Sequence, residues 1–357
     1  MSARLQRLLE RLPEAGVDAM LVTDLINVRY LTGYSGSNGV ALLMPDSPKF
    51  LTDFRYVEQA AEEVDAAYDR PPAALDLLEA VGETLPPGDL RLGYEDAHIS
   101  VWDYRRLRER LPERVELVAV HGLVEGLRRV KGSGELARIK AATVLADEAF
   151  QALLEGPLAG VTEHQVAVRL DHAMRERGAT GSSFPTIVAA GANGARPHAR
   201  PRDVEIGRGD LVVIDWGAEL DGYFSDCTRT IAAGDPGEDA LAAYDLVLRA
   251  QLTGLQAVRA GAGGREVDGT ARAVIEAGGQ GERFGHGLGH GVGLEVHEPP
   301  RLSQSSEDVL ASGNVVTVEP GVYAPGQFGV RIEDLVVVTE DGCEILTSVS
   351  KELSVVE

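Results

Sequence analysis

The sequence predicts a two-domain protein in which a small α/β domain precedes a larger α+β domain. Its 357 residues exceed one average domain, and 44% hydrophobic with 25% charged residues is the composition of a folded globular chain. The first third alternates short β-rich runs with amphipathic helical runs, whereas the remainder is dominated by β-hairpins broken by glycine. We place the boundary near residue 128, so the expected domains are 1–127 and 128–357.

Hydrophobic periodicity and capping residues predict the individual elements. In the first domain, strands are expected at residues 18–23, 39–44 and 49–52, and a helix at residues 55–64. The second domain opens with a long helix at 133–154, with Ser133 as its N-cap and Gly156 at its end. Thr162 and Gln165 have the spacing of a capping box, which starts another helix. Further strands are expected at 211–216, 222–231, 315–323 and 329–339, and further helices at 239–260 and 267–277.

Charge and composition exclude several classes of function. Lysine and arginine number 34 against 56 acidic residues, so a net charge of -22 would repel a nucleic-acid backbone. The amino terminus has no apolar signal segment, and no stretch approaches the roughly 18 apolar residues of a membrane span. Cys227 and Cys343 are the only cysteines, which is too few for a disulfide framework. We therefore expect a cytoplasmic protein with neither nucleic-acid nor membrane partners.

Acidic residues inside apolar β-runs are the first chemical signal, because a carboxylate on a buried strand is costly unless a cation pairs with it. Asp215 and Asp226 lie on two runs joined by the turn signal Asp221-Gly222. A turn centred there places Asp215 opposite Thr228, so Asp226 lies diagonally from Asp215 on the same face. The two carboxylates are then placed to share a cation.

A second hairpin repeats the pattern. Folding the chain about Gly326 places Glu319 opposite Glu333, which makes a second pair of inward acids. The alternative for either pair is a set of strand-end acids that face solvent. The recurrence of the pattern on two hairpins favours a shared cation site.

Histidines between the hairpins complete the pattern. His286, His290 and His297 lie in a glycine-rich segment, where backbone and ligands approach closely. One imidazole with four carboxylates forms a hard, oxygen-rich site that favours manganese, iron or cobalt over a thiolate zinc site. The segment has no G-x-G-x-x-G motif, and the chain has no P-loop, H-E-x-x-H or G-x-S-x-G motif. Cys227 is interpreted as a packing residue and not as a nucleophile.

These residues resemble the pita-bread metallopeptidases, the group of methionine aminopeptidase, aminopeptidase P and prolidase. The resemblance spans nearly the whole chain and implies a creatinase-like amino-terminal domain before a pita-bread catalytic domain. It implies that Asp215 holds one metal, His290 and Glu319 hold the other, and Asp226 and Glu333 bridge both. His198, His286 and His297 match the family's active-site histidines. Manganese is the expected metal, with cobalt, iron or zinc as alternatives, and the resemblance also implies a homodimer.

The resemblance implies cleavage of the bond before proline by a hydroxide that bridges two divalent metals. Glu319 is then the proton carrier to the leaving nitrogen. Arg331 is expected to steady a ligand carboxylate or the neighbouring domain, with an ordinary ion pair as the alternative. Residues 30–41 and 51–60 resemble aminopeptidase P more than prolidase. The expected activity is an Xaa-Pro aminopeptidase acting on proline-containing peptides, with Xaa-Pro dipeptidase as the alternative. A non-catalytic peptide-binding module is disfavoured because all five metal ligands are present, and their presence also disfavours creatinase.

Overall fold

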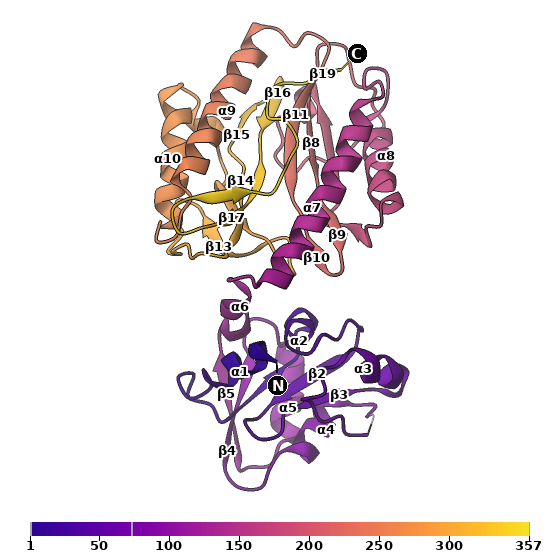
Figure 1. Ribbon diagram of the computed structural model, residues 1–357, viewed down its shortest axis with the longest axis vertical. Coiled ribbons are helices and arrows are strands. Elements are labelled where there is room, and N and C mark those ends of the chain that lie inside the picture. Colours follow the sequence, from indigo (N-terminus) through magenta and orange to yellow (C-terminus); the bar gives the residue numbers. More distant parts are fainter. Residues whose placement is uncertain (1, 73, 357) are drawn as a thin grey trace. The chain divides into compact units, whose positions relative to one another are not determined.

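The computed structural model describes residues 2–72 and 74–356. The chain divides into two compact units, Met1–Arg128 and Arg129–Glu357, each with its own sheets and helices (Figure 1). In the part of the chain that the structure describes, none of the helices combines the length and apolar character needed to cross a bilayer.

The amino-terminal unit is built on one five-stranded sheet. Its order is β3-β2-β1-β4-β5, with β1, β4 and β5 parallel and with β2 and β3 antiparallel additions. The strands are β1 (Ala19–Val22), β2 (Gly39–Leu43), β3 (Lys49–Thr52), β4 (Leu90–Glu95) and β5 (Val115–Val120). The helices are α1 (Ala3–Leu9), α2 (Leu25–Thr32), α3 (Val57–Glu63), α4 (Leu77–Thr84), α5 (Val101–Arg110) and α6 (Leu123–Arg128). The helix expected at 55–64 is α3 preceded by the short 3-10 turn Phe54–Tyr56.

The carboxy-terminal unit has two halves, each made of two sheets and covered by a pair of helices. α7 (Ser133–Leu154) and α8 (Glu163–Glu176) lie on one side, and α9 (Glu238–Ala257) and α10 (Gly264–Ala277) lie on the other (Figure 1). The first half contains β6 (Gly181–Ser182), β7 (Ile187–Ala190), β8 (Leu211–Trp216), β9 (Ala218–Leu220), β10 (Tyr223–Phe224), β11 (Cys227–Ala233) and β19 (Val355–Val356). The second contains β12 (Gly289–Gly291), β13 (Glu298–Leu302), β14 (Val315–Val318), β15 (Gly321–Ala324), β16 (Phe328–Arg331), β17 (Asp334–Val338) and β18 (Cys343–Ile345).

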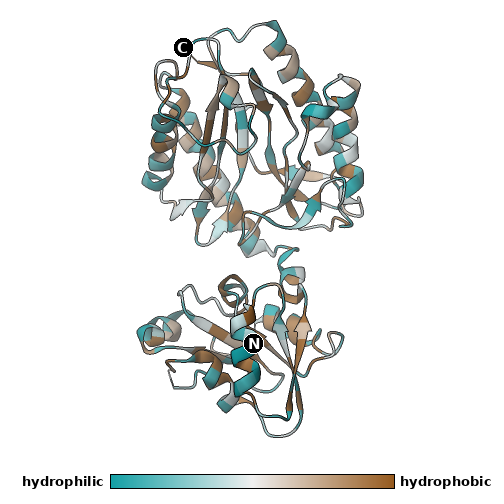
Figure 2. Cartoon of the chain, turned by 180° about the vertical axis from the view of Figure 1, so that it is seen from behind, coloured by the Kyte–Doolittle hydropathy of each residue, from teal (hydrophilic) through white to brown (hydrophobic). Residues whose placement is uncertain are grey.

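Hydrophobic burial holds each half together. One core joins α7 and α8 to β7, β8 and β11, and another joins α9 and α10 to β14, β16 and β17. The strands between the helices are correspondingly the most hydrophobic part of the unit in Figure 2. In the first core the rings of Phe150 and Trp216 stack with their centroids 4.0 Å apart. These two cores fix the positions of the strands, and the acidic residues described below lie at the ends of these strands.

The helix caps agree with the sequence at one position and differ at another. Thr162 Oγ1 accepts from the Gln165 backbone at 3.1 Å, and the Gln165 side chain accepts from the Thr162 backbone at 3.2 Å, so the capping box is confirmed. The prediction that Ser133 caps α7 is wrong. Gly132 is the N-cap, and its backbone N–H donates to the Glu135 carboxylate at 2.9 Å. The Glu135 carboxylate, three residues after the N-cap, therefore caps the helix terminus in place of the expected Ser133 hydroxyl.

Three predicted strands are interrupted. The runs expected at 222–231, 315–323 and 329–339 are each split in two, into β10 and β11, β14 and β15, and β16 and β17. The prediction of uninterrupted strands is therefore wrong. Glu319-Pro320 forms one break, because proline has no N–H to donate to a strand partner. Asp226 and Glu333 lie in the other two breaks, so each interruption carries an acidic residue.

Candidate metal centre

The first acidic pair has the register that the sequence predicts. β9 and β10 are joined by a two-residue turn in which Asp221 and Gly222 have φ of 50° and 76°. That conformation is typical of a type I′ hairpin and favours glycine at the second position. The pairing of β8 with β11 then places Asp215 opposite Thr228. Asp226, which is 5% exposed, lies just before β11.

The second acidic pair also follows its predicted register. Val318 pairs with Asp334 on one side of the strand breaks, and Gly321 pairs with Arg331 on the other. One register therefore continues through the interruption and sets Glu319 across from Glu333. Glu333 is 2% exposed, so its carboxylate lies inside the protein.

His290 on β12 joins the two pairs. Its Nε2 atom lies 3.3 Å from Glu319 Oε1 and 3.6 Å from Asp226 Oδ2. Ligand atoms of Asp226, His290 and Glu333 all lie within 4.8 Å of one another. Segments more than 40 residues apart in the sequence thus bring two carboxylates and an imidazole to one point.

These residues line a cavity of about 530 Å³. Every residue that the sequence analysis assigned to the site lies on its wall. These residues are His198, Asp215, Asp226, His286, His290, His297, Glu319, Arg331 and Glu333. The wall also includes Phe184, Pro185, Ile187, Pro197, Ala199, Arg200, Gly287, Gly289, Arg301 and Ser303. The cavity is therefore lined by both charged and apolar residues.

Burial and mutual repulsion raise the pKa values of three carboxylates of the centre. Burial, together with the charges of Glu333, Asp215 and Glu319, raises the pKa of Asp226 well above its usual range. Burial, together with Glu319 and Asp215, likewise raises the pKa of Glu333 well above its usual range. For Asp215, burial raises the pKa although the positive charge of Arg331 opposes the rise. The protein alone therefore does not stabilise these carboxylates in their charged form.

Glu319 differs from the other acids because cationic partners surround it. Burial acts to raise its pKa, but the hydrogen bond from His290 and the charges of His290, His286 and Arg331 outweigh burial and lower the pKa to about 2. The Thr317 hydroxyl lies 3.2 Å from Glu319 Oε1, and it also accepts from the His290 backbone at 3.1 Å. Glu319 is thus held as a carboxylate beside the imidazole.

Unsatisfied carboxylate oxygens show that the centre fits cations. Asp215 Oδ1 and Glu333 Oε1 are buried and have no hydrogen-bond partner among the described residues. A buried carboxylate oxygen without a donor carries a desolvation cost that a bound cation offsets. Four carboxylates and one imidazole are also the hard donors that divalent metals prefer. The residues present therefore fit a divalent metal centre.

Arg331 is occupied within the centre. Its Nη2 atom lies 2.6 Å from Asp215 Oδ2, and its Nη1 atom donates to the Tyr323 hydroxyl at 2.9 Å and to the Pro197 carbonyl at 3.1 Å. Its Nε atom donates to Thr228 Oγ1 at 3.0 Å. The ion-pair alternative from the sequence is therefore what the structure shows. The guanidinium is held against Asp215, and its predicted role toward a ligand carboxylate stays a prediction.

The three other histidines have different environments. His286 bonds through Nε2 to the Tyr323 hydroxyl at 2.9 Å and through Nδ1 to the Gly287 carbonyl at 2.8 Å, and burial lowers its pKa. The His297 ring lies 4.3 Å from the His290 ring, and burial with the His290 charge lowers its pKa to about 4. His198 and His297 are exposed on the cavity wall, whereas both ring nitrogens of His286 already have partners.

Sequence reasoning missed three polar residues of the centre. Tyr323 links His286 to Arg331, and Arg200 and Arg301 line the cavity. The register of β12 and β13 places Arg301 opposite His290, so it lies on the face of the metal ligands. Its position four residues after His297 was the signal available in the sequence.

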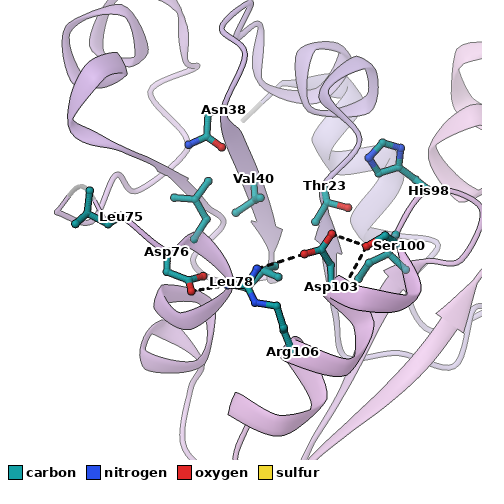
Figure 3. Close-up of a pocket in the computed structure, with 12 residues that line it drawn as sticks. Thr23, Asn38, Val40, Leu75, Asp76, Leu78, His98, Ser100, Asp103 and Arg106 are labelled. Atoms are coloured by element: carbon teal, nitrogen blue, oxygen red, sulfur yellow. Dashed lines mark hydrogen bonds and ion pairs between the residues drawn. The ribbon is translucent and has the colours of Figure 1, made fainter.

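A second cavity, of about 580 Å³, lies within the amino-terminal unit beside the ends of β1 and β4 (Figure 3). Its charged side chains pair with one another. Arg106 lies 2.6 Å from Asp76 Oδ2 and 3.4 Å from Asp103 Oδ1, and Ser100 donates to Asp103 at 2.7 Å. Within the described ranges, no buried polar atom that lacks a partner lies on its wall. The carboxylate cavity is therefore the better candidate for a reactive site.

Comparison with known proteins decides the family. Metallopeptidase family M24 matches residues 137–340, and the creatinase/prolidase amino-terminal domain matches residues 4–130. The chain belongs to metallopeptidase family M24. The expected fold, a creatinase-like domain followed by a pita-bread catalytic domain, is confirmed. The carboxylates and the histidine described above lie within the part of the chain that matches family M24.

Relatives of this M24 protein match it over almost its full length. The structure of an Xaa-Pro dipeptidase from Bacillus anthracis has a TM-score of 0.95 and 40% sequence identity, covering 99% of both chains. An Xaa-Pro dipeptidase from Pyrococcus furiosus is 36% identical over 99% of this chain and 100% of its own. The structure of an X-Pro aminopeptidase from Thermotoga maritima MSB8 has a TM-score of 0.91 and 35% identity, covering 99% of this chain and 100% of its own.

Proposed function

We propose that this metallopeptidase hydrolyses Xaa-Pro dipeptides and releases free proline. The observation that carries the proposal is Arg301 on the cavity wall. Its side chain is exposed, and it forms no ion pair with any residue that the structure describes. A dipeptide presents a carboxylate directly after its proline, and an unpaired guanidinium is a suitable partner for that carboxylate. The Xaa-Pro dipeptidases of Bacillus anthracis and Pyrococcus furiosus support the same substrate class.

An Xaa-Pro aminopeptidase is the second candidate, and it is the activity that the sequence favoured. The resemblance of residues 30–41 and 51–60 to aminopeptidase P motivated that expectation. The Thermotoga maritima X-Pro aminopeptidase supports it as well. Arg301 did not enter the sequence argument, and it shifts our proposal toward the dipeptidase.

The centre would hold two divalent metals, of which we infer manganese as the native one. Asp215 would bind one metal, His290 and Glu319 the other, and Asp226 and Glu333 both. Bound there, the metals would acidify a water and polarise the scissile carbonyl. The proline nitrogen of an Xaa-Pro bond carries no hydrogen, so it must gain a proton to leave as the amine.

Glu319 is suited to deliver that proton. Its ionised state lets it accept a proton from the attacking water, and Thr317 and His290 fix its orientation. Water adds its oxygen to the carbonyl carbon, the C–N bond breaks, and the proton passes from Glu319 to the proline nitrogen. His297, beside the His290 ring, is placed to donate to the charge that develops on the carbonyl oxygen.

We expect Ala-Pro to be hydrolysed with a kcat/KM at least about tenfold above that of Ala-Pro-Ala.

Arg301→Met should raise the KM for Ala-Pro by roughly 10-fold to 100-fold, because a charge-assisted hydrogen bond is lost, and should change Ala-Pro-Ala hydrolysis little. Arg265→Met, at an exposed position of α10, is the matched control. Faster release of alanine from the tripeptide than from the dipeptide would transfer the assignment to the aminopeptidase.

His297→Ala should lower turnover by roughly 100-fold and leave metal content near the wild-type value. The reason is that a side chain facing the developing charge stabilises the transition state and does not hold the metal. Atomic absorption on the purified variant, measured beside its kcat, tests this assignment. Parallel loss of metal and turnover would make His297 a ligand instead.

A further inference from the structure

The loop that carries His198 and Arg200 is anchored at both ends by one buried carboxylate. This loop, residues 191–202, follows β7 and begins with the 3-10 turn Gly191–Asn193. Glu163, the first residue of α8, is only 1% exposed. Its carboxylate faces the loop, and none of its hydrogen bonds goes to the backbone of its own helix. An acidic residue at this position usually supports the helix terminus, so the direction of this carboxylate indicates another role.

Glu163 accepts five hydrogen bonds from the two ends of the loop. At the start, Ala190 N donates to Oε1 at 2.9 Å and Asn193 Nδ2 donates to Oε2 at 3.0 Å. At the end, Arg202 donates through its backbone N at 2.9 Å and through its guanidinium at 3.0 Å and 2.8 Å. The Asn193 side chain also donates to the Arg200 carbonyl at 3.3 Å. The carboxylate thus closes the loop between its two ends.

The energetics of this contact favour a fixed loop. Burial acts to raise the pKa of Glu163, but the hydrogen bonds from Arg202 and from two backbone N–H groups outweigh burial and lower the pKa. The ionised carboxylate is therefore stabilised only while the loop ends stay in place. A loop that opened would leave a buried charge without donors, which costs free energy.

The opposite side of the loop touches the metal centre. Arg331, which is bound to Asp215, also donates to the Pro197 carbonyl at 3.1 Å, directly before His198. A Cβ on Gly329 would collide with the Gly194 carbonyl, so the loop packs directly on β16. Glu163 therefore fixes the loop at its ends, and Arg331 fixes its middle to a metal ligand. His198 projects from the segment between these anchors.

We infer that Glu163 and Arg202 form a clamp that positions His198 over the reacting bond. Both are positioning residues, since neither lines the cavity. The inference rests on the proposed peptidase function for its effect on turnover. The effect on the loop itself is independent of that function. Geometric errors near 1 Å at a reacting group are enough to reduce rates strongly, so release of the clamp should be visible in kcat.

Arg202→Met is the first test variant, because the Arg202 side chain is partly exposed and its removal leaves Glu163 with three donors. Glu163→Gln is the second. Arg169→Met, at an exposed arginine of α8, is the matched control. Hydrogen exchange of the backbone amides in residues 191–201 should be at least about tenfold faster in both test variants than in the control. Unchanged protection of these amides would overturn the clamp, whatever the protein hydrolyses.

Turnover of Ala-Pro separates positioning from general destabilisation. We expect Arg202→Met to lower kcat by about tenfold, and to lower it less than about twofold in a protein that already carries His198→Ala. Equal effects in both backgrounds would show that the clamp does not act through His198. A His198→Ala variant with wild-type turnover would overturn the inference in the same way. A wild-type protein that hydrolyses no Xaa-Pro peptide would refute the proposed function and leave the exchange measurement to decide the clamp.

Discussion

Replacing Glu333 by glutamine is expected to abolish peptide hydrolysis, with a loss of more than about 100-fold in kcat. Even a disturbed partner of a metal ligand commonly costs 10-fold to 100-fold, and Glu333 is proposed to bind both metals itself. Its Oε1 atom is buried and has no donor within the described part of the chain, so this oxygen is the one that a metal would take. Metal content, measured by atomic absorption after gel filtration, should fall together with kcat.

The control for this variant is Glu344→Gln on β18, where the carboxylate is exposed and pairs with Lys140 at 3.1 Å. An exposed ion pair contributes little, so its metal content and kcat should stay near wild type. The amino-terminal unit should remain folded in both variants, because its core is separate. Near-normal hydrolysis by Glu333→Gln would remove Glu333 from the proposed metal ligands.

The pairing of the site carboxylates could be predicted because strand side chains alternate with a period of two. A two-residue turn at Asp221-Gly222 fixes the register of its hairpin, so the position of Asp215 opposite Thr228 follows from local sequence alone. The same logic places Glu319 across from Glu333. The strand breaks beside these acids could not be predicted, because the alternating pattern continues through them. Only the proline after Glu319 signals an interruption.

Partners that are distant along the chain lay beyond sequence reasoning. Arg331 contacts Asp215 across 116 residues, and Arg202 meets Glu163 across 39. The first pair depends on how the two halves of the M24 fold meet, and the second depends on how α8 packs beside the loop after β7. No local pattern encodes either arrangement. An arginine is also equally suited to a substrate carboxylate and to an internal one. The sequence therefore left the role of Arg331 open and missed Arg301.

Removing the metals with a chelator is expected to abolish activity and to lower the melting temperature. A metal that binds only the folded protein stabilises it, and chelation removes that contribution. Manganese or cobalt should restore hydrolysis better than magnesium, which retains its waters and prefers an octahedral oxygen shell. Activity that survived exhaustive chelation would exclude the proposed metal-dependent reaction.

In the metal-free protein, Glu333→Gln should raise the melting temperature, whereas in the metal-bound protein it should lower it. The pKa of Glu333 is raised by burial and by the charges of Glu319 and Asp215, so its charged form destabilises the metal-free fold at neutral pH. A neutral glutamine removes that charge. We therefore expect chelated Glu333→Gln to melt about 2 °C or more above chelated wild type, and to melt below wild type when manganese is present. Calorimetry of the four samples tests the sign of the change in melting temperature in both states. A variant that melts below wild type in both states would contradict repulsion among the carboxylates of this centre.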